Sequence, residues 1–94
     1  VDMCLKKVLN FSVFDRVTVR FYIYVIETQV GKMCISISRD DFGSLVIDIC
    51  HEKAGCIWLE RSYDNYKFII RLVNGLEPVK TGLAKNGKLI GEEA

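Results

Sequence analysis

Apolar and polar residues alternate in four stretches of the first half of the chain, and this period of two is typical of strands with one buried face. The alternating apolar residues are Leu9, Phe11 and Val13, then Val17, Val19, Phe21, Ile23 and Val25, then Ile35 and Ile37, and finally Leu45, Ile47 and Ile49. The connections between these stretches are residues 15–16, 29–31 and 40–43, which are polar or contain glycine. Connections this short join antiparallel neighbours, so the pattern predicts a four-stranded antiparallel meander that is apolar on one face.

The period changes after Cys50, where the apolar residues recur at helical spacing. The helical stripe is Leu59, Tyr63, Tyr66, Ile70 and Val73, with Trp58, Ser62 and Ile69 beside it. Asn74-Gly75 and the following Pro78 are typical of a helix end. The pattern indicates one helix of about four turns, which would cover the apolar face of the meander.

The sequence therefore predicts one α+β domain over residues 1–94, in which a four-stranded antiparallel meander packs against one C-terminal amphipathic helix. Its core is residues 9–74, in the order ββββα, and residues 76–94 form a short tail. Asn86-Gly87 favours a hairpin turn, so this tail is expected either as a short hairpin or as a frayed polar segment.

Matching the buried faces of the last two predicted strands also fixes their register. Ile35 and Ile37 are expected opposite Ile49 and Ile47, because a slip of one residue would turn every side chain to the other face. The same register places Cys34 opposite Cys50 on the outer face of the sheet.

The four cysteines are Cys4, Cys34, Cys50 and Cys56, and no CxxC motif occurs among them. A disulfide between Cys34 and Cys50 is compatible with their predicted register, but we expect four free thiols in a reducing compartment. No apolar run is long enough to span a membrane, and no secretory signal precedes the first strand. These features predict an intracellular protein of the cytoplasm or nucleus with no membrane partner.

Candidate catalytic chemistry is sparse. Cys50 and His51 are neighbours on a strand and point to opposite faces, so they are not expected to form a thiolate–imidazole couple. His51 is the single histidine and has no partner at zinc-finger spacing. Asp40-Asp41 is expected as a solvated turn. We therefore expect no enzyme, no metal site and no cofactor.

The outer face of the predicted sheet carries an arginine and two tyrosines among small polar residues. Its residues are Asn10, Ser12, Thr18, Arg20, Tyr22, Tyr24, Cys34, Ser36, Ser38, Val46 and Asp48. Tyrosine rings stack on nucleic-acid bases, and arginine adds phosphate and cation–π contacts. Together with Lys32 and Arg39 at the hairpin ends, Arg20, Tyr22 and Tyr24 form the candidate binding site.

The quoted segments "FYIYVIETQVGKMCISISRDDFGSLVIDIC" and "HEKAGCIWLERSYDNY" resemble a Pur-type repeat and, more distantly, the Whirly-like nucleic-acid-binding folds. In such repeats an aromatic-rich strand leads through a glycine–basic turn into a strand of alternating isoleucines, and a third strand and an amphipathic helix follow. The positions that match are Gly31, Lys32, Ile35, Ile37, Arg39, Ile47, Ile49, Trp58 and Leu59. The resemblance covers about residues 9–74.

The resemblance implies binding of single-stranded DNA or RNA on the curved sheet by two repeats acting together, so a chain with one repeat would form a homodimer. The net charge of +1 is a small basic excess for a protein that binds phosphates. The alternative is a protein-interaction or homodimerisation module, in which the same face or the unpaired strand edge meets another chain and nucleic acid is not bound.

Overall fold

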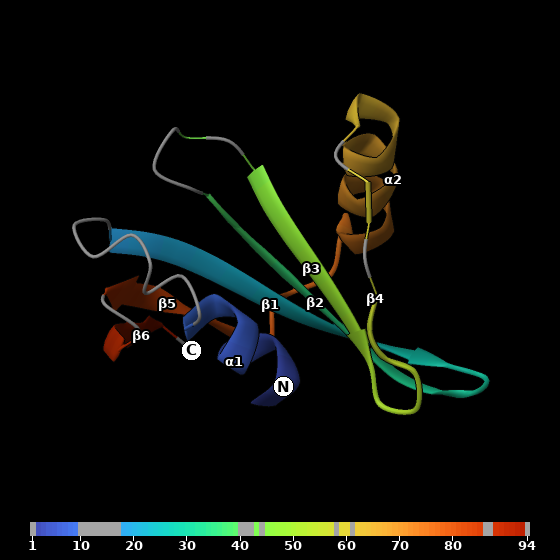
Figure 1. The fold of residues 1–94 in the computed structure, drawn as a ribbon, viewed down its shortest axis with the longest axis horizontal. Coiled ribbons are helices and arrows are strands. Elements are labelled where there is room, and N and C mark those ends of the chain that lie inside the picture. The colour runs from blue at the N-terminus through green and yellow to red at the C-terminus, as the bar shows by residue number, and fades with distance from the viewer. Residues whose placement is uncertain are drawn as a thin grey trace.

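Six antiparallel strands and two helices account for the secondary structure that the computed structural model describes, which covers residues 2–9, 18–39, 43, 45–57, 59–60, 62–85 and 88–93. The elements are α1 (Asp2–Leu9), β1 (Thr18–Thr28), β2 (Gly31–Arg39), β3 (Leu45–His51), β4 (Gly55–Ile57), α2 (Tyr63–Val73), β5 (Lys80–Lys85) and β6 (Lys88–Glu93). The strands form one sheet in the order β4-β3-β2-β1-β5-β6 (Figure 1). All neighbouring strands in this sheet are antiparallel.

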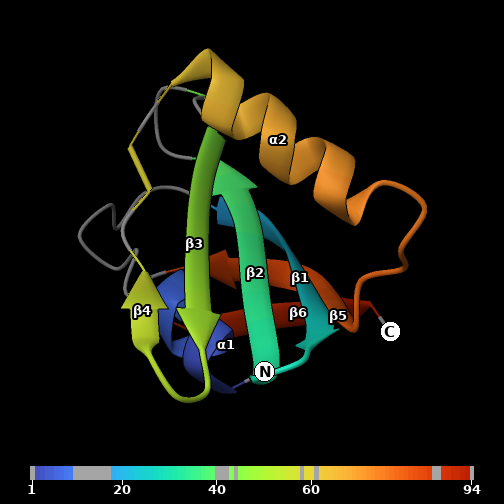
Figure 2. The same cartoon turned by 90° about the vertical axis from the view of Figure 1, so that its right-hand side faces the viewer.

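This architecture corrects the predicted four-stranded meander with one helix, because the described sheet has six strands and a helix lies on each of its faces (Figures 1 and 2). Leu9, placed in the first predicted strand, is the last residue of α1, and residues 10–13 of that strand lie outside the described residues. Residues 55–57, for which the sequence predicted no strand, form the edge strand β4. The C-terminal segment adopts the hairpin alternative, with β5 paired to both β1 and β6.

The turn between β1 and β2 decides which side chains share a face. The sequence predicts a three-residue connection over 29–31, whereas the structure has a two-residue turn that pairs Tyr22 with Ile37 and Tyr24 with Ile35. Side chains alternate along a strand, so one residue fewer in the turn brings the other face of β1 beside the buried isoleucines of β2. The expected common apolar face of β1, β2 and β3 is therefore wrong for β1.

The pairing of β2 with β3 is the one that the sequence predicted. Ile35 lies opposite Ile49, and Ile37 lies opposite Ile47. Cys34 lies opposite Cys50 in the same ladder. Here both strands bury the same set of alternate residues against the same helix, so matching apolar faces gives the correct register.

One face of the sheet is covered by α1, whose last residue, Leu9, was predicted to begin a strand. The cluster on this face consists of Cys4, Val8, Phe21, Ile23, Cys34 and Ala84. Cys4 and Val8 are spaced by four residues, so they lie on the same side of α1 and point at β1 and β2. Ser36 lies opposite Ile23 and is buried on this face, as is Ser38. The expected exposed face with these serines and Cys34 is wrong because α1 packs against it.

The other face of the sheet carries α2, which Figure 2 shows crossing the strands at one end. Its cluster consists of Ile35, Ile37, Ile49, Ile69 and Val73. The helix begins after Ser62, whose Oγ accepts a hydrogen bond from the Asn65 backbone N–H at 3.1 Å. It ends at Val73, and Gly75 follows with φ of +83°, as the Asn74-Gly75 pair predicted. The helix has three turns rather than four, because it begins only at Tyr63, and Leu59, Glu60 and Ser62 precede it outside any helix or strand.

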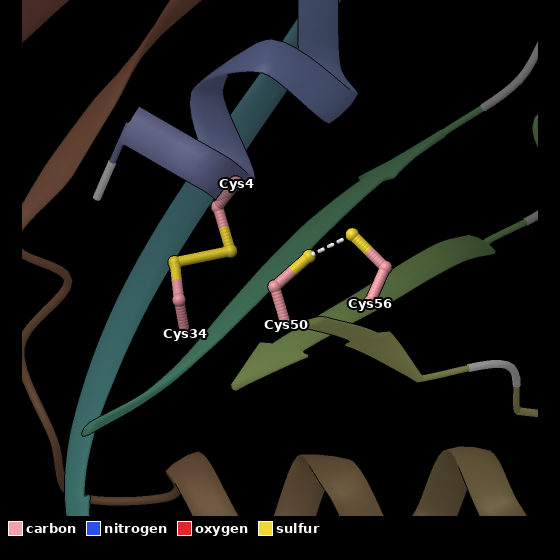
Figure 3. The surroundings of a disulfide bond; sticks show 4 residues. All are labelled: Cys4, Cys34, Cys50 and Cys56. Carbon is pink, nitrogen blue, oxygen red and sulfur yellow. Dashed lines mark hydrogen bonds between the residues drawn. A yellow bond between two sulfur atoms is a disulfide. The ribbon is translucent and has the colours of Figure 1, made fainter. Parts of the chain in front are cut away.

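The four cysteines lie near one another in two pairs, each formed between two different elements (Figure 3). Cys4 of α1 and Cys34 of β2 form a disulfide. Cys50 of β3 and Cys56 of β4 are free thiols, and their Sγ atoms are 2.6 Å apart. The expectation of four free thiols is therefore wrong, because α1 brings Cys4 onto the face of β2 that carries Cys34.

Within the described part of the chain, neither helix has the length and apolar content needed to cross a membrane.

Candidate functional site

A groove of about 710 Å³ lies between the C-terminal half of α2 and the adjacent end of β1 and β2. Its floor includes Arg20, Tyr22, Tyr24, Ile37 and Arg39, and its wall includes Ile70, Val73, Asn74, Gly75 and Leu76. The groove exists because α2 packs over β2 and β3 through Ile69 and Val73 and leaves part of β1 uncovered. Its volume is in the range of ligand-binding clefts in proteins.

Four of the five residues predicted for the binding site line this groove. Arg20, Tyr22 and Tyr24 occupy alternate positions of β1 and therefore share a face. Tyr22 is paired with Ile37, and the two strands run antiparallel. Arg20, two residues before Tyr22, and Arg39, two residues after Ile37, therefore lie at the same end of the sheet and on the same face. The alternation in the sequence thus brought these side chains together, although the face they occupy is the one under α2.

The two tyrosines are not equivalent. Tyr22 is 38% exposed, so its ring is open to a molecule in the groove. Tyr24 is half-buried and packs against the isoleucine cluster beneath α2. Tyr22 can therefore offer a stacking surface, while Tyr24 forms part of the floor.

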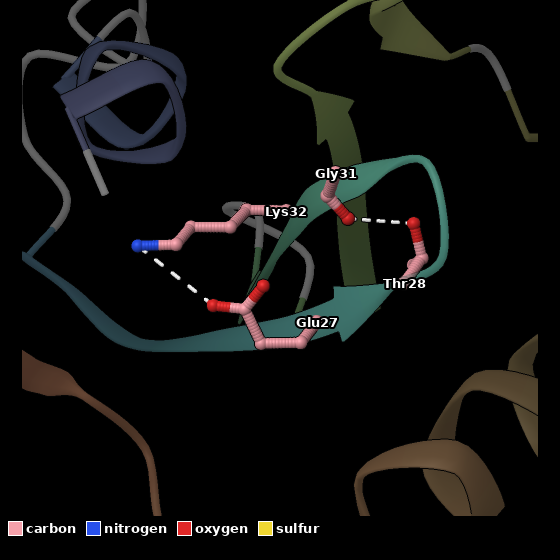
Figure 4. Close-up of polar contacts among 4 residues, drawn as sticks. All are labelled: Glu27, Thr28, Gly31 and Lys32. Atoms are coloured by element: carbon pink, nitrogen blue, oxygen red, sulfur yellow. Dashed lines mark hydrogen bonds and ion pairs between the residues drawn. The ribbon is translucent and has the colours of Figure 1, made fainter.

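Lys32, the fifth predicted residue, lies outside the groove. It follows the β1–β2 turn, where its Nζ is 3.8 Å from Glu27 Oε1 (Figure 4). The turn is held by Thr28, whose hydroxyl donates to the Gly31 carbonyl oxygen at 2.6 Å. Gly31 itself has φ of +129°, a conformation that glycine adopts without strain. Both charged side chains are largely exposed, so this ion pair contributes little to stability.

The electrostatic character of the groove comes from its two arginines. Among the described residues that line it, none is acidic. Arg39 Nη1 donates to the Gly43 carbonyl oxygen at 2.6 Å, which holds the guanidinium at the mouth of the groove. Lys85 of β5 is exposed beside the groove, where it pairs with Thr18 of β1. This arrangement is suited to an anionic ligand that also has flat rings.

The other candidate chemistry does not assemble into a site. His51 is buried, and its Nδ1 accepts a hydrogen bond from the Lys53 backbone N–H at 3.1 Å, whereas the sulfur nearest Cys50 belongs to Cys56. Asp40-Asp41 lies outside the described residues. The described residues include no group of three or more histidine, cysteine or acidic side chains placed to bind a metal ion.

The residues that sequence reasoning missed form the wall of the groove. Ile70 was assigned to the buried stripe of the helix, but it is exposed and faces the groove. Leu76 follows the end of the helix, where no periodicity indicates its position. The direction of α2 across the sheet decides both contacts, and the sequence pattern carries no signal for that direction.

The fold and the groove define an antiparallel α+β domain with a cationic, tyrosine-lined cleft. Comparison with protein-family models, with curated proteins and with solved structures found no match. The resemblance to Pur-type repeats stays a prediction from the sequence.

Proposed function

We propose that the protein binds single-stranded nucleic acid, DNA or RNA, in the groove between α2 and the sheet. The observation that carries this proposal is the convergence of Arg20, Tyr22 and Arg39 on one cleft. A base stacks on the exposed ring of Tyr22, and the two guanidinium groups contact the flanking phosphates. The site is a groove with one wall formed by α2, in place of the open platform expected from the sequence.

The size of the groove limits the contact to one or two nucleotides, because about 710 Å³ is the volume of a small-ligand cleft. With two cations in contact, the binding constant should fall with salt at a logarithmic slope of about −1.4, from about −0.7 for each phosphate neutralised on a single strand. Raising monovalent salt from about 50 to about 200 mM should then weaken binding about sevenfold.

The test is a titration of fluorescently labelled oligothymidine and oligouridine, read by anisotropy at those two salt concentrations. Tyr22→Ala should weaken binding at least about fivefold, because stacking of one base contributes about 1–3 kcal/mol. Tyr63→Ala is the matched control, since Tyr63 is a 75% exposed tyrosine of α2 that does not line the groove. Arg20→Ala should reduce the salt slope by about 0.7, whereas Arg71→Ala on the outer side of α2 should leave it unchanged.

A wild-type protein that binds neither oligonucleotide at low salt would contradict the proposal. Equal losses in the Tyr22→Ala and Tyr63→Ala variants would also contradict it, because the groove would then have no special part in binding.

A second candidate function, a protein-interaction or homodimerisation module, is favoured by a different observation. Apolar side chains are exposed along α2 and the segment after it, and they are Tyr63, Phe68, Ile70, Leu72, Leu76 and Val79. Exposed apolar surface of this kind marks interfaces between proteins. This function predicts a dimer in solution, measured by light scattering after gel filtration, that is indifferent to oligonucleotides and is weakened by Phe68→Ala with Leu72→Ala. A monomer at high concentration would rule out the homodimer.

A further inference from the structure

The free cysteines of β3 and β4 have no part in the groove, and they lie on the opposite face of the sheet. Cys50 and Cys56 are directly paired across the two strands, with their Sγ atoms 2.6 Å apart. Cys50 in turn lies opposite Cys34, which is bonded to Cys4, so the thiol pair adjoins an existing disulfide (Figure 3). Two sulfur atoms held this close on neighbouring strands are placed to form a bond without rearrangement of the sheet.

The two thiols differ in access. Cys56 is exposed on β4, a three-residue strand at the edge of the sheet. Cys50 has 0% exposed surface. A reagent from solution can therefore reach the sulfur of Cys56 but not that of Cys50.

We propose that Cys50 and Cys56 form a dithiol site that takes up a second, reversible disulfide by exchange with a small-molecule disulfide, and that Cys56 is the entry thiol. The thiolate of Cys56 attacks one sulfur of the external disulfide. The external S–S bond breaks, one thiolate leaves and takes a proton, and a mixed disulfide remains on Cys56.

The sulfur of Cys50 then loses its proton and attacks the sulfur of Cys56, which breaks the mixed disulfide. The second small-molecule thiolate leaves and takes up that proton. Two cysteine thiols are oxidised, and one external disulfide is reduced to two thiols. Cys50 need not be accessible from solvent for the second step, because the sulfur of Cys56 that it attacks is already in contact with it.

The chemical environment supports this order of events. Burial and the neighbouring Cys56 thiol raise the pKa of Cys50 to about 12, so Cys50 is a protonated thiol at neutral pH. A protonated, buried thiol reacts slowly with reagents in solution, so Cys56 reacts first, and Cys50 attacks only because the sulfur of Cys56 is in contact with it. The bond would join β4 to β3 and fix the edge of the sheet, where backbone groups otherwise remain open to pairing.

The test uses the full chain with its Cys4–Cys34 disulfide intact, equilibrated in glutathione buffers of increasing oxidised fraction. Samples are quenched with acid, alkylated and mapped by mass spectrometry. The expected result is a Cys50–Cys56 disulfide that appears with oxidised glutathione and disappears with reduced glutathione.

Two single variants test the roles of the thiols. Cys50→Ser should stop at the mixed disulfide of Cys56 with glutathione. Cys56→Ser should lower the rate of modification by at least about tenfold, because the remaining thiol is buried and protonated. The double variant Cys4→Ser with Cys34→Ser is the control, and it should retain exchange at the dithiol site.

Three results would overturn the proposal. The first is two free thiols in the native protein at every glutathione ratio while the urea-unfolded chain oxidises. The second is equal rates of glutathione addition to the two single variants. The third is a mapped Cys34–Cys50 bond, which would show exchange within the chain in place of the site described. None of these results depends on the groove, so this proposal fails or stands separately from nucleic-acid binding.

Discussion

The Cys50 thiol is completely buried, and this burial raises its pKa from 9.0 to about 12, with a further contribution from the hydrogen-bonded Cys56 thiol. The folded protein therefore holds this proton more tightly than the unfolded chain does. The contribution to stability is complete below about pH 9 and is lost as the pH rises toward about 12, where the folded thiol also ionises. We expect the free energy of unfolding to fall with pH above about 9, measured by urea denaturation under exclusion of oxidants.

Other groups titrate in the same range, so the comparison needs a variant without this thiol. Cys50→Ala should show a smaller decrease across the same pH interval, because the group with the raised pKa is absent. Parallel pH profiles for the two proteins would mean that the Cys50 thiol has the same proton affinity in the folded and unfolded states.

At the residue scale, the sequence indicates which side chains share a face of the sheet but not which helix covers that face. Alternation along β1 placed Arg20, Tyr22 and Tyr24 on one face, and the structure lines one groove with them. Alternation says nothing about which helix covers that face. Tyr22 is 38% exposed at the side of the groove, whereas Tyr24 packs against the isoleucine cluster.

At the scale of elements, a single residue in one turn decides which face of β1 lies beside the buried face of β2. A chain with alternating residues can pair either face of β1 with β2, and the choice depends on whether the turn holds an odd or an even number of residues. The segment 29–31 is polar and glycine-containing in either case, so its composition does not reveal that Gly31 belongs to β2. The same limit applies to β4, whose three residues are too short for a periodic signal.

The start of α2 offers a direct test of how local sequence sets an element. Ser62 has an extended backbone, and its Oγ accepts from the Asn65 N–H at 3.1 Å, which satisfies one of the amide groups that the first turn leaves open. Ser62→Ala should lower the free energy of unfolding by about 1 kcal/mol, measured by urea denaturation followed by circular dichroism. Ser62→Asp should retain most of the stability, because a carboxylate accepts the same bond and suits the helix N-terminus. Equal stability of the alanine and aspartate variants would show that the cap is not used.

At the scale of the whole molecule, a helix packs on each face of the sheet. The prediction of a sheet with only one buried face was wrong for this reason. The prediction supplied one helix and therefore one apolar layer. The structure has two layers, with Phe21 and Ile23 under α1 and Ile35 and Ile37 under α2. Residues 2–9 mix Lys6 and Lys7 with apolar positions over a stretch too short for a strong helical period, so their role as a covering helix was not apparent.

The Cys4–Cys34 disulfide connects α1 to the centre of the sheet across a sequence separation of 30 residues. A bond that closes a loop of this length removes conformational freedom from the unfolded chain, and the loop-entropy model gives about 3–4 kcal/mol. We expect the double variant Cys4→Ala with Cys34→Ala to lose about that much free energy of unfolding in urea denaturation, with α1 no longer tethered to β2.

Part of any loss will come from the missing buried sulfur atoms and not from the bond. Cys50→Ala measures that packing cost for a thiol that is equally buried and not bridged. The double variant should exceed twice the cost of Cys50→Ala, and the remainder is the contribution of the covalent link. Reduction of the wild-type bond by dithiothreitol should reproduce this remainder without the packing loss. A double variant that costs no more than two buried thiols would mean that contacts of Cys4 and Val8 with the sheet, and not the disulfide, hold α1 in place.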